Sequence, residues 1–211
     1  MTGDRTPAGA GATPEATGSA SASLYERYKD ALRRGHVAAL RGRHEAAIDA
    51  YSEAAGIAPD RALPHASIGA ILLKMDRSAD ALRAYERALA LAPRDEGALR
   101  GLAEVHQRAG RRTLAAERLD RLAEILEAGG RLADATDAAR RALELAESRA
   151  RRSQVEALAE RLRAAEGDDV ARRALDDALR VLDPRGGERG ARGGRGGVEL
   201  DREATPPPQE G

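Results

Sequence analysis

Apolar and small residues recur at helical spacing through most of the chain. Over residues 23–182 they return every three or four positions, as one face of a helix requires, and no segment alternates with the period of a strand. Ser23 and Glu26 form a capping-box pattern at the start of this region. Pro59 and Pro93 mark the ends of helices, because proline disfavours helical geometry in the residue before it. We therefore predict an all-α domain of about nine helices over residues 23–182.

The helical region repeats itself with a period of 34 residues. Residues 31–60 match residues 65–95, and each stretch fits a first helix, a turn and a second helix. Small residues at matched positions let paired helices approach closely, and a large side chain fills the space between them. The matched positions are Gly35 with Gly69, Ala47 with Ala81 and Ala115, Tyr51 with Tyr85 and Leu119, Ala54 with Ala88, and Pro59 with Pro93.

The turns between helices also repeat, and they show where the pattern changes. Gly42 and Gly110 occupy the turns of the first and third units, and Asp76 takes that place in the second. Later in the chain, a fourth turn and second helix are indicated by Gly130, Ala135 and Ala142. Because Ala135 follows Ala115 after only 20 residues, we expect the helix over 112–128 to serve two units.

This pattern of glycines, alanines and tyrosines, with Leu72 on the apolar face of the second unit, resembles the tetratricopeptide repeat family. The resemblance implies a right-handed solenoid of helix-turn-helix units. The expected units are residues 28–61, 62–95, 96–128, 112–148 with a shared helix, and a degenerate unit over 152–184. Arg34 stands where the family prefers an apolar residue. We attribute it to the open outer edge of the first unit, where a polar cap is expected.

Composition limits what the protein can do. The chain has 35 Lys and Arg against 35 Asp and Glu, so its formal net charge is zero, which argues against nucleic-acid binding by the folded part. It has no cysteine, so disulfides, thiolate metal sites and cysteine nucleophiles are excluded. Residues 1–22 and 183–211 are rich in Gly, Ala, Arg and Pro and are predicted to be disordered tails. Without an apolar leader or spanning segment, we expect a cytoplasmic protein with no membrane contact.

The sequence lacks the motifs of catalysis. The four histidines are His36, His44, His65 and His106, and no pair of them has the spacing of metal ligands. No phosphate-binding loop or nucleophile elbow is present. We therefore predict no catalytic residue, no cofactor and no bound metal, and a protein that is not an enzyme.

The family resemblance implies that the first helices line a concave groove. Such a groove suits an extended peptide or a partner helix, although the same residues could be ordinary solvent-facing side chains. The predicted groove residues are Leu32, His36, Ala39, Leu40, Ala66, Ala70, Leu73, Lys74, Arg100, Glu104, Gln107 and Arg108. Chaperone-binding members use basic and amide side chains to clamp a carboxylate. The corresponding residues here, Leu32, His36, Ala66, Gly97 and Gly101, do not supply them.

The main prediction is a protein–protein interaction scaffold, and two further possibilities stay open. The Arg-Gly-Gly segments within residues 185–197 could contact RNA or single strands. A homo-oligomer is also possible, and the Leu/Arg-rich segment 143–165 is the candidate surface for it. A helix buried in the stack would explain the leucines of that segment equally well.

Overall fold

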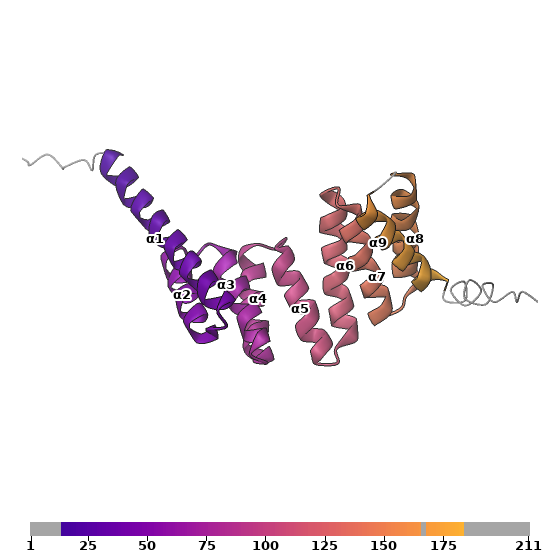
Figure 1. Ribbon diagram of the computed structural model, residues 1–211, viewed down its shortest axis with the longest axis horizontal. Coiled ribbons are helices and arrows are strands. Elements are labelled where there is room, and N and C mark those ends of the chain that lie inside the picture. Colours follow the sequence, from indigo (N-terminus) through magenta and orange to yellow (C-terminus); the bar gives the residue numbers. More distant parts are fainter. Residues whose placement is uncertain (1–13, 166–167, 184–211) are drawn as a thin grey trace, which may run out of the picture.

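The computed structural model describes residues 14–165 and 168–183, which form nine α-helices and no strand. The helices follow one another in a row, from α1 at one end to α8 and α9 at the other (Figure 1). This arrangement confirms the predicted all-α class. The helices are α1 (Pro14–Leu40), α2 (His44–Ile57), α3 (Ala62–Lys74), α4 (Ser78–Leu91), α5 (Glu96–Arg108), α6 (Arg112–Ala128), α7 (Leu132–Leu145), α8 (Arg149–Ala164) and α9 (Asp169–Leu182). None of them is long and apolar enough to cross a membrane.

Each helix packs against its neighbours in sequence. Helix α1 contacts α2, α3 contacts α4, and the second helix of each pair contacts the first helix of the next. Helix α6 packs against both α5 and α7, and both α8 and α9 pack against α7. A unit therefore buries its apolar faces only through the units beside it, which is the physical basis of a solenoid.

The start of α1 differs from the sequence prediction. The helix begins at Pro14, so Ser23 and Glu26 lie inside it and do not cap it. Proline favours the first turn of a helix, where its missing N–H costs no hydrogen bond. Residues 14–22 therefore belong to α1 and not to the predicted tail. The remaining parts of the two predicted tails, including the Arg-Gly-Gly segments, lie outside the described residues, apart from residue 183.

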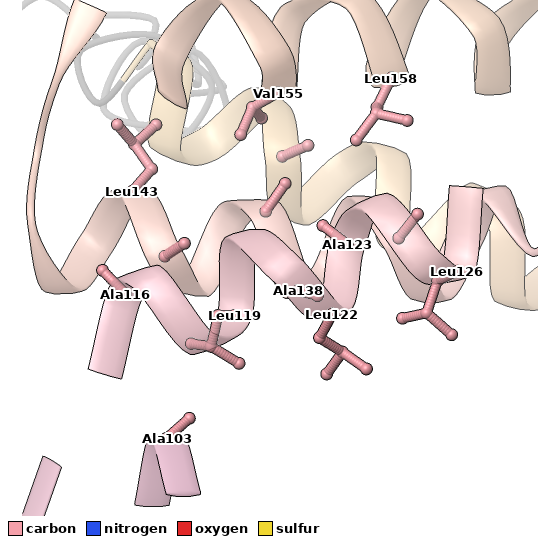
Figure 2. Close-up of a cluster of buried hydrophobic side chains, with 14 of the residues drawn as sticks. Ala103, Ala116, Leu119, Leu122, Ala123, Leu126, Ala138, Leu143, Val155 and Leu158 are labelled. Carbon is pink, nitrogen blue, oxygen red and sulfur yellow. The ribbon is translucent and has the colours of Figure 1, made fainter. Parts of the chain in front are cut away.

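The core is continuous from α5 to α9. Leu119 and Leu122 of α6, which point toward the side of Ala103 in Figure 2, belong to the same buried cluster as Leu143 of α7 and Val155 and Leu158 of α8. Helix α5 contributes residues both to this cluster and to a second cluster around Tyr85, because adjacent residues of a helix point to different sides. Leu99 and Ala103 enter the first cluster, and Ala98, Leu102 and Val105 enter the second.

The repeated residues lie at the contacts between helices. The alanines Ala47, Ala54, Ala81, Ala88, Ala115, Ala135 and Ala142 have no exposed surface. Tyr51, Tyr85 and Leu119 are also buried. A Cβ atom added to Gly35 would lie 2.6 Å from the Tyr51 ring, and one added to Gly69 would lie 2.8 Å from the Tyr85 ring. Each ring therefore occupies the space that a side chain would need.

Three turns end in a glycine that adopts left-handed backbone geometry. Gly42, Gly110 and Gly130 have φ angles of 69°, 70° and 74°, and Asp76 has 60° at the same place in the second unit. After Gly42 the chain turns back, and the N–H of Arg43 donates to the carbonyl oxygen of Ala38 at 2.9 Å. Only glycine adopts this geometry without strain, so Asp76 is the least favourable of the four.

Arginines near the start of one helix hold the C-terminal end of a neighbouring helix. Arg112 of α6 donates to the carbonyl oxygen of Leu145, and Arg152 of α8 donates to that of Leu182, at 2.9 and 3.0 Å. A positive charge at a helix C-terminus is favourable because the helix dipole is negative there. Arg151 instead forms a half-buried, two-pronged ion pair with Asp120 of α6, the shortest distance being 2.8 Å.

One histidine is buried at the junction of α5 with α6. His106 is 6% exposed, and its Nδ1 atom has no hydrogen-bond partner among the described residues. Burial lowers the pKa of His106, and the nearby Arg111 and Arg118 lower it further. The imidazole is therefore neutral at neutral pH.

Candidate functional site

The structure places the predicted groove residues on α1, α3 and α5, the first helices of three successive units. The exposed members are His36 and Leu40 on α1, Ala70 and Lys74 on α3, and Arg100, Glu104, Gln107 and Arg108 on α5. Leu32, Ala39 and Ala66 are half-buried.

Leu73 does not belong to this surface. It is 4% exposed and packs in the cluster that contains Leu72, Tyr85 and Leu102. Helix α3 contacts α5 as well as α4, so its buried face is wide enough to include two adjacent leucines. The expectation that Leu73 lines a groove is therefore corrected.

Arg108 is exposed but already engaged within the protein. It donates to the carbonyl oxygen of Leu73 at 2.9 Å and to the carboxylate of Glu104 at 2.5 Å. These bonds join α5 to the end of α3 and neutralise both side chains. In contrast, Lys74 and Arg100 form no ion pair with any described residue, so their charges are free to meet a partner.

A pocket of about 330 Å³ opens between α1 and α3. Two predicted groove residues line it, Leu32 and His36 of α1. Arg33 of α1, Tyr51 of α2, and Leu63 and Ser67 of α3 complete the lining. Leu63 is 53% exposed, which is high for a leucine on a helix that packs on three others.

Tyr51 supplies the polar end of the pocket. Its hydroxyl oxygen lies 3.2 Å from Nδ1 of His36. Burial raises the pKa of Tyr51, while a hydrogen bond with Ser67 lowers it by a smaller amount. The phenol is thus neutral and a poor nucleophile at neutral pH. The pocket offers an apolar wall and a neutral hydrogen-bonding group, which suits binding better than catalysis.

Tyr85 occupies the equivalent place in the second unit but is enclosed. A Cβ atom added to Gly69 of α3 would lie 2.8 Å from its ring, and one added to Gly101 of α5 would lie 2.5 Å from its Cε1 atom. The ring is therefore sandwiched between two glycines. Burial is the main cause that raises the pKa of Tyr85 to about 12.

Sequence reasoning missed several of these roles. It did not select Leu63 or Ser67. At a shift of 34 residues these align with Lys29 and Arg33, so the repeat comparison pairs them with residues of a different type. It considered Gly101 only as a position of the carboxylate clamp. A glycine inside a helix was the available signal, since it commonly marks a close approach. No group of three metal-binding side chains occurs within residues 14–165 and 168–183.

Solved structures of low sequence identity share this arrangement of helices. The TPR2B domain of yeast Sti1, in its pHsp70 complex, matches with a TM-score of 0.54 at 18% identity, over 59% of this chain and 99% of that one. The TPR domain of Arabidopsis OM64 matches with a TM-score of 0.50 at 16% identity, over 57% of this chain and 98% of that one. The protein has the tetratricopeptide repeat fold.

The extent of each match shows how much of this chain corresponds to one TPR domain. Each matched domain is covered almost completely but accounts for less than two thirds of this chain. The chain is therefore longer than one such domain. No protein-family model matches the sequence, and no curated protein matches it.

Proposed function

We propose that this protein is a non-catalytic scaffold that binds an extended peptide segment of another protein along α1, α3 and α5. The α1–α3 pocket accepts one apolar side chain of that peptide as an anchor. The observation that carries the proposal is the pocket itself, which combines Leu32 and Leu63 with the Tyr51 hydroxyl. Binding pockets commonly combine an apolar lining with a few polar groups that fix orientation.

The helices around the pocket favour binding without reordering. Tyr51 is held by its contact with Gly35 and by its polar contact with His36. Because the pocket is formed by packed helices and not by loops, a peptide would lose little affinity to ordering of the protein.

The charges beyond the pocket favour an acidic peptide. Lys74 on α3 and Arg100 on α5 are exposed and lack ion pairs among the described residues, and Glu104 is neutralised by Arg108. The surface that follows the pocket along the stack is therefore positive. We expect the anchor residue to be accompanied by Asp or Glu, because opposite charges raise the association rate and fix the register.

A library of random peptides supplies the probe that tests the proposal. The peptides are displayed on phage and selected on the full-length protein, and the best binder is synthesised and measured against variants. Leu63→Glu should weaken binding at least about tenfold, equivalent to about 1.4 kcal/mol, because it places a charge in the mouth of the pocket.

Val170→Glu is the matched control. Val170 is 54% exposed on α9, close to the 53% of Leu63, and it lies at the other end of the stack. It should leave the affinity unchanged. Equal affinity of the Leu63→Glu variant and the native protein would contradict the proposal, as would selection of no peptide above an unrelated control protein.

A further inference from the structure

The outer face of the first helix pair is hollow and uncovered. Between α1 and α2 it encloses about 380 Å³. We call this surface the N-terminal face, and it consists of Arg34, Val37, Ala38, Arg41, Arg43, Ala46, Asp49, Ala50 and Glu53. It lies outside the groove and the pocket between α1 and α3.

The next unit shows what this kind of face does inside the stack. A shift of 34 residues takes Val37 to Ile71 and Arg41 to Met75. Ile71 and Met75 pack in a cluster with Ala47 and Tyr51 of α2, so in the second unit the equivalent face of the first helix is covered by the unit before it. In the first unit nothing among the described residues covers Val37, which is 40% exposed.

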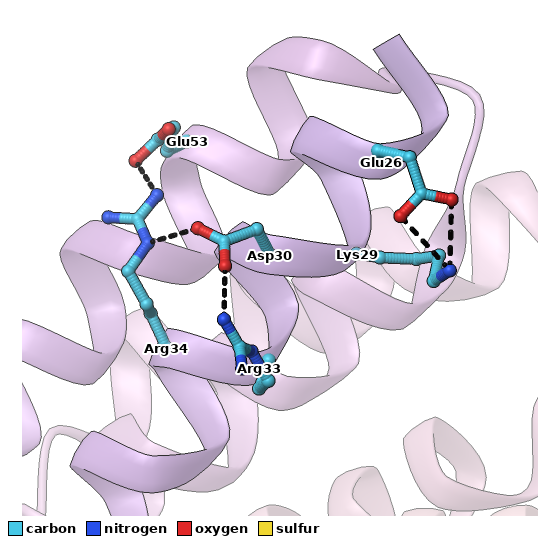
Figure 3. Close-up of polar contacts among 6 residues, drawn as sticks. All are labelled: Glu26, Lys29, Asp30, Arg33, Arg34 and Glu53. Atoms are coloured by element: carbon cyan, nitrogen blue, oxygen red, sulfur yellow. Dashed lines mark hydrogen bonds and ion pairs between the residues drawn. The ribbon is translucent and has the colours of Figure 1, made fainter. Parts of the chain in front are cut away.

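Some charges of the N-terminal face are neutralised within the chain. Arg34 donates to Glu53 at 2.7 Å and to Asp30 at 3.1 Å, so it links α1 with α2 (Figure 3). These bonds satisfy the charge of Arg34 within the chain, so a partner does not have to neutralise it.

Other charges of the face remain without a partner. Arg41, Arg43 and Asp49 are exposed, and none of them forms an ion pair with a described residue. Both arginines lie in the turn between α1 and α2, and the acidic residue lies on α2. The face therefore carries unpaired charges of both signs, two basic and one acidic, so Asp49 of the partner subunit could pair with one of the two arginines.

We propose that two copies of this protein associate through their N-terminal faces. A two-fold axis that runs along the helices places α1 of each copy across α2 of the other, so that Arg41 meets Asp49 of the partner subunit, twice in the dimer. The same arrangement brings Val37 over the hollow between the helices of the other copy, where Ala46 and Ala50 leave space. Two-fold, self-complementary contacts are the commonest way in which soluble chains pair.

The segment 143–165, proposed from the sequence as a self-association surface, is not available for this contact. Leu143, Val155, Leu158 and Leu162 are each 5% exposed or less, and the first three belong to the core cluster that joins α5 to α9. Their helical spacing is explained by burial within one chain.

Reversing charges tests the pairing, with the full-length chain studied by sedimentation velocity. The native protein should form dimers at micromolar concentration. Arg41→Asp and Asp49→Arg should each raise the dimer dissociation constant at least about tenfold, because each places like charges opposite one another twice. An equal mixture of the two variants should restore the dimer, because both contacts then join opposite charges.

Two control substitutions make the same charge changes elsewhere. Asp176→Arg on α9 and Arg94→Asp after α4 affect exposed residues without ion pairs among the described residues, and neither should change the dissociation constant. Circular dichroism shows whether each variant is folded. A native protein that stays monomeric would overturn the proposal, as would a mixture that fails to restore the dimer, or a dimer that tolerates either single reversal.

Discussion

The contact of Tyr85 with Gly101 gives the sharpest prediction about stability. A Cβ atom on residue 101 would lie 2.5 and 2.6 Å from the two Cε atoms of the Tyr85 ring, whereas ordinary van der Waals contact begins at 3.4 Å. The Cζ atom of the ring would be closer still, so the ring would have to move by more than about 1 Å. It cannot move freely, because its neighbouring side packs against Gly69, where an added Cβ atom would lie 2.8 Å from the ring.

The free energy of unfolding should therefore fall in Gly101→Ala. Overpacking a buried site costs about 1–3 kcal/mol, and replacing a helical glycine by alanine returns about 0.5–1 kcal/mol. We expect a net loss of about 1–2 kcal/mol, which corresponds to a melting temperature lower by about 3–6 °C for a domain of this size. Urea and thermal unfolding followed by circular dichroism measure both quantities.

Gly56→Ala is the control for helix propensity alone. Gly56 lies in the last turn of α2, and a Cβ atom there would have no neighbour within 4 Å. Gly56→Ala should raise stability by up to about 0.5–1 kcal/mol, the value for the middle of a helix. If Gly101→Ala is as stable as Gly56→Ala, the argument from close packing is refuted.

The third unit suggests a second substitution that should reduce the loss of stability in Gly101→Ala. There the large residue is Leu119, and the residue equivalent to Gly69 is Ala103, so the smaller leucine goes with an alanine in place of a glycine. Tyr85→Leu combined with Gly101→Ala makes the same exchange on the other side of the ring. The double variant should lose less stability than the sum of the two single losses, because neighbouring residues that share a contact are not additive.

Three further outcomes are expected from the full-length protein. Arg151→Ala leaves the carboxylate of Asp120 half-buried and unpaired, so it should lower the free energy of unfolding in urea by about 1–2 kcal/mol. Arg163→Ala removes an exposed ion pair and should change that free energy by less than about 0.5 kcal/mol. Burial holds the pKa of His106 in the folded state below the 6.5 of the unfolded chain. As the pH falls through about 6.5, the unfolded state therefore binds more protons and stability decreases, and His106→Leu should show a smaller decrease. Asp76→Gly should raise the melting temperature, through a gain of about 0.5–1 kcal/mol, because glycine suits a φ of 60°.

The sequence predicted the repeating part of this fold well because its repeats are visible as coincidences at one offset. Gly35 with Gly69 and Tyr51 with Tyr85 are rare residue types at matched places, and the structure places them at helix contacts. The start of α1 was less predictable, because Pro14 and Ser23 are both acceptable helix starts and local patterns do not decide between them.

The candidate site was predicted only in part, because its residues were selected at matching positions of the first helix in every unit. This selection placed Leu73 in the groove by analogy with Ala39 and Gln107, but α3 also contacts α5, which buries Leu73. The selection did not include Leu63, because the exposure of Leu63 depends on how the neighbouring helices pack around α3. Such departures between units depend on tertiary contacts that no single helix pattern contains.

The difference between Tyr51 and Tyr85 shows how a repeated residue comes to serve two purposes. Both rings pack against a glycine of the preceding helix, but the following helix presents Gly101 to Tyr85 and Ser67 to Tyr51. A glycine lets α5 close over the ring of Tyr85, whereas Ser67 lines the α1–α3 pocket together with Tyr51. Ser67→Gly should therefore act on the pocket more than on the stack. We expect it to weaken the selected peptide while leaving the urea midpoint nearly unchanged, and the reverse result would mean that Tyr51, like Tyr85, serves only to join the units.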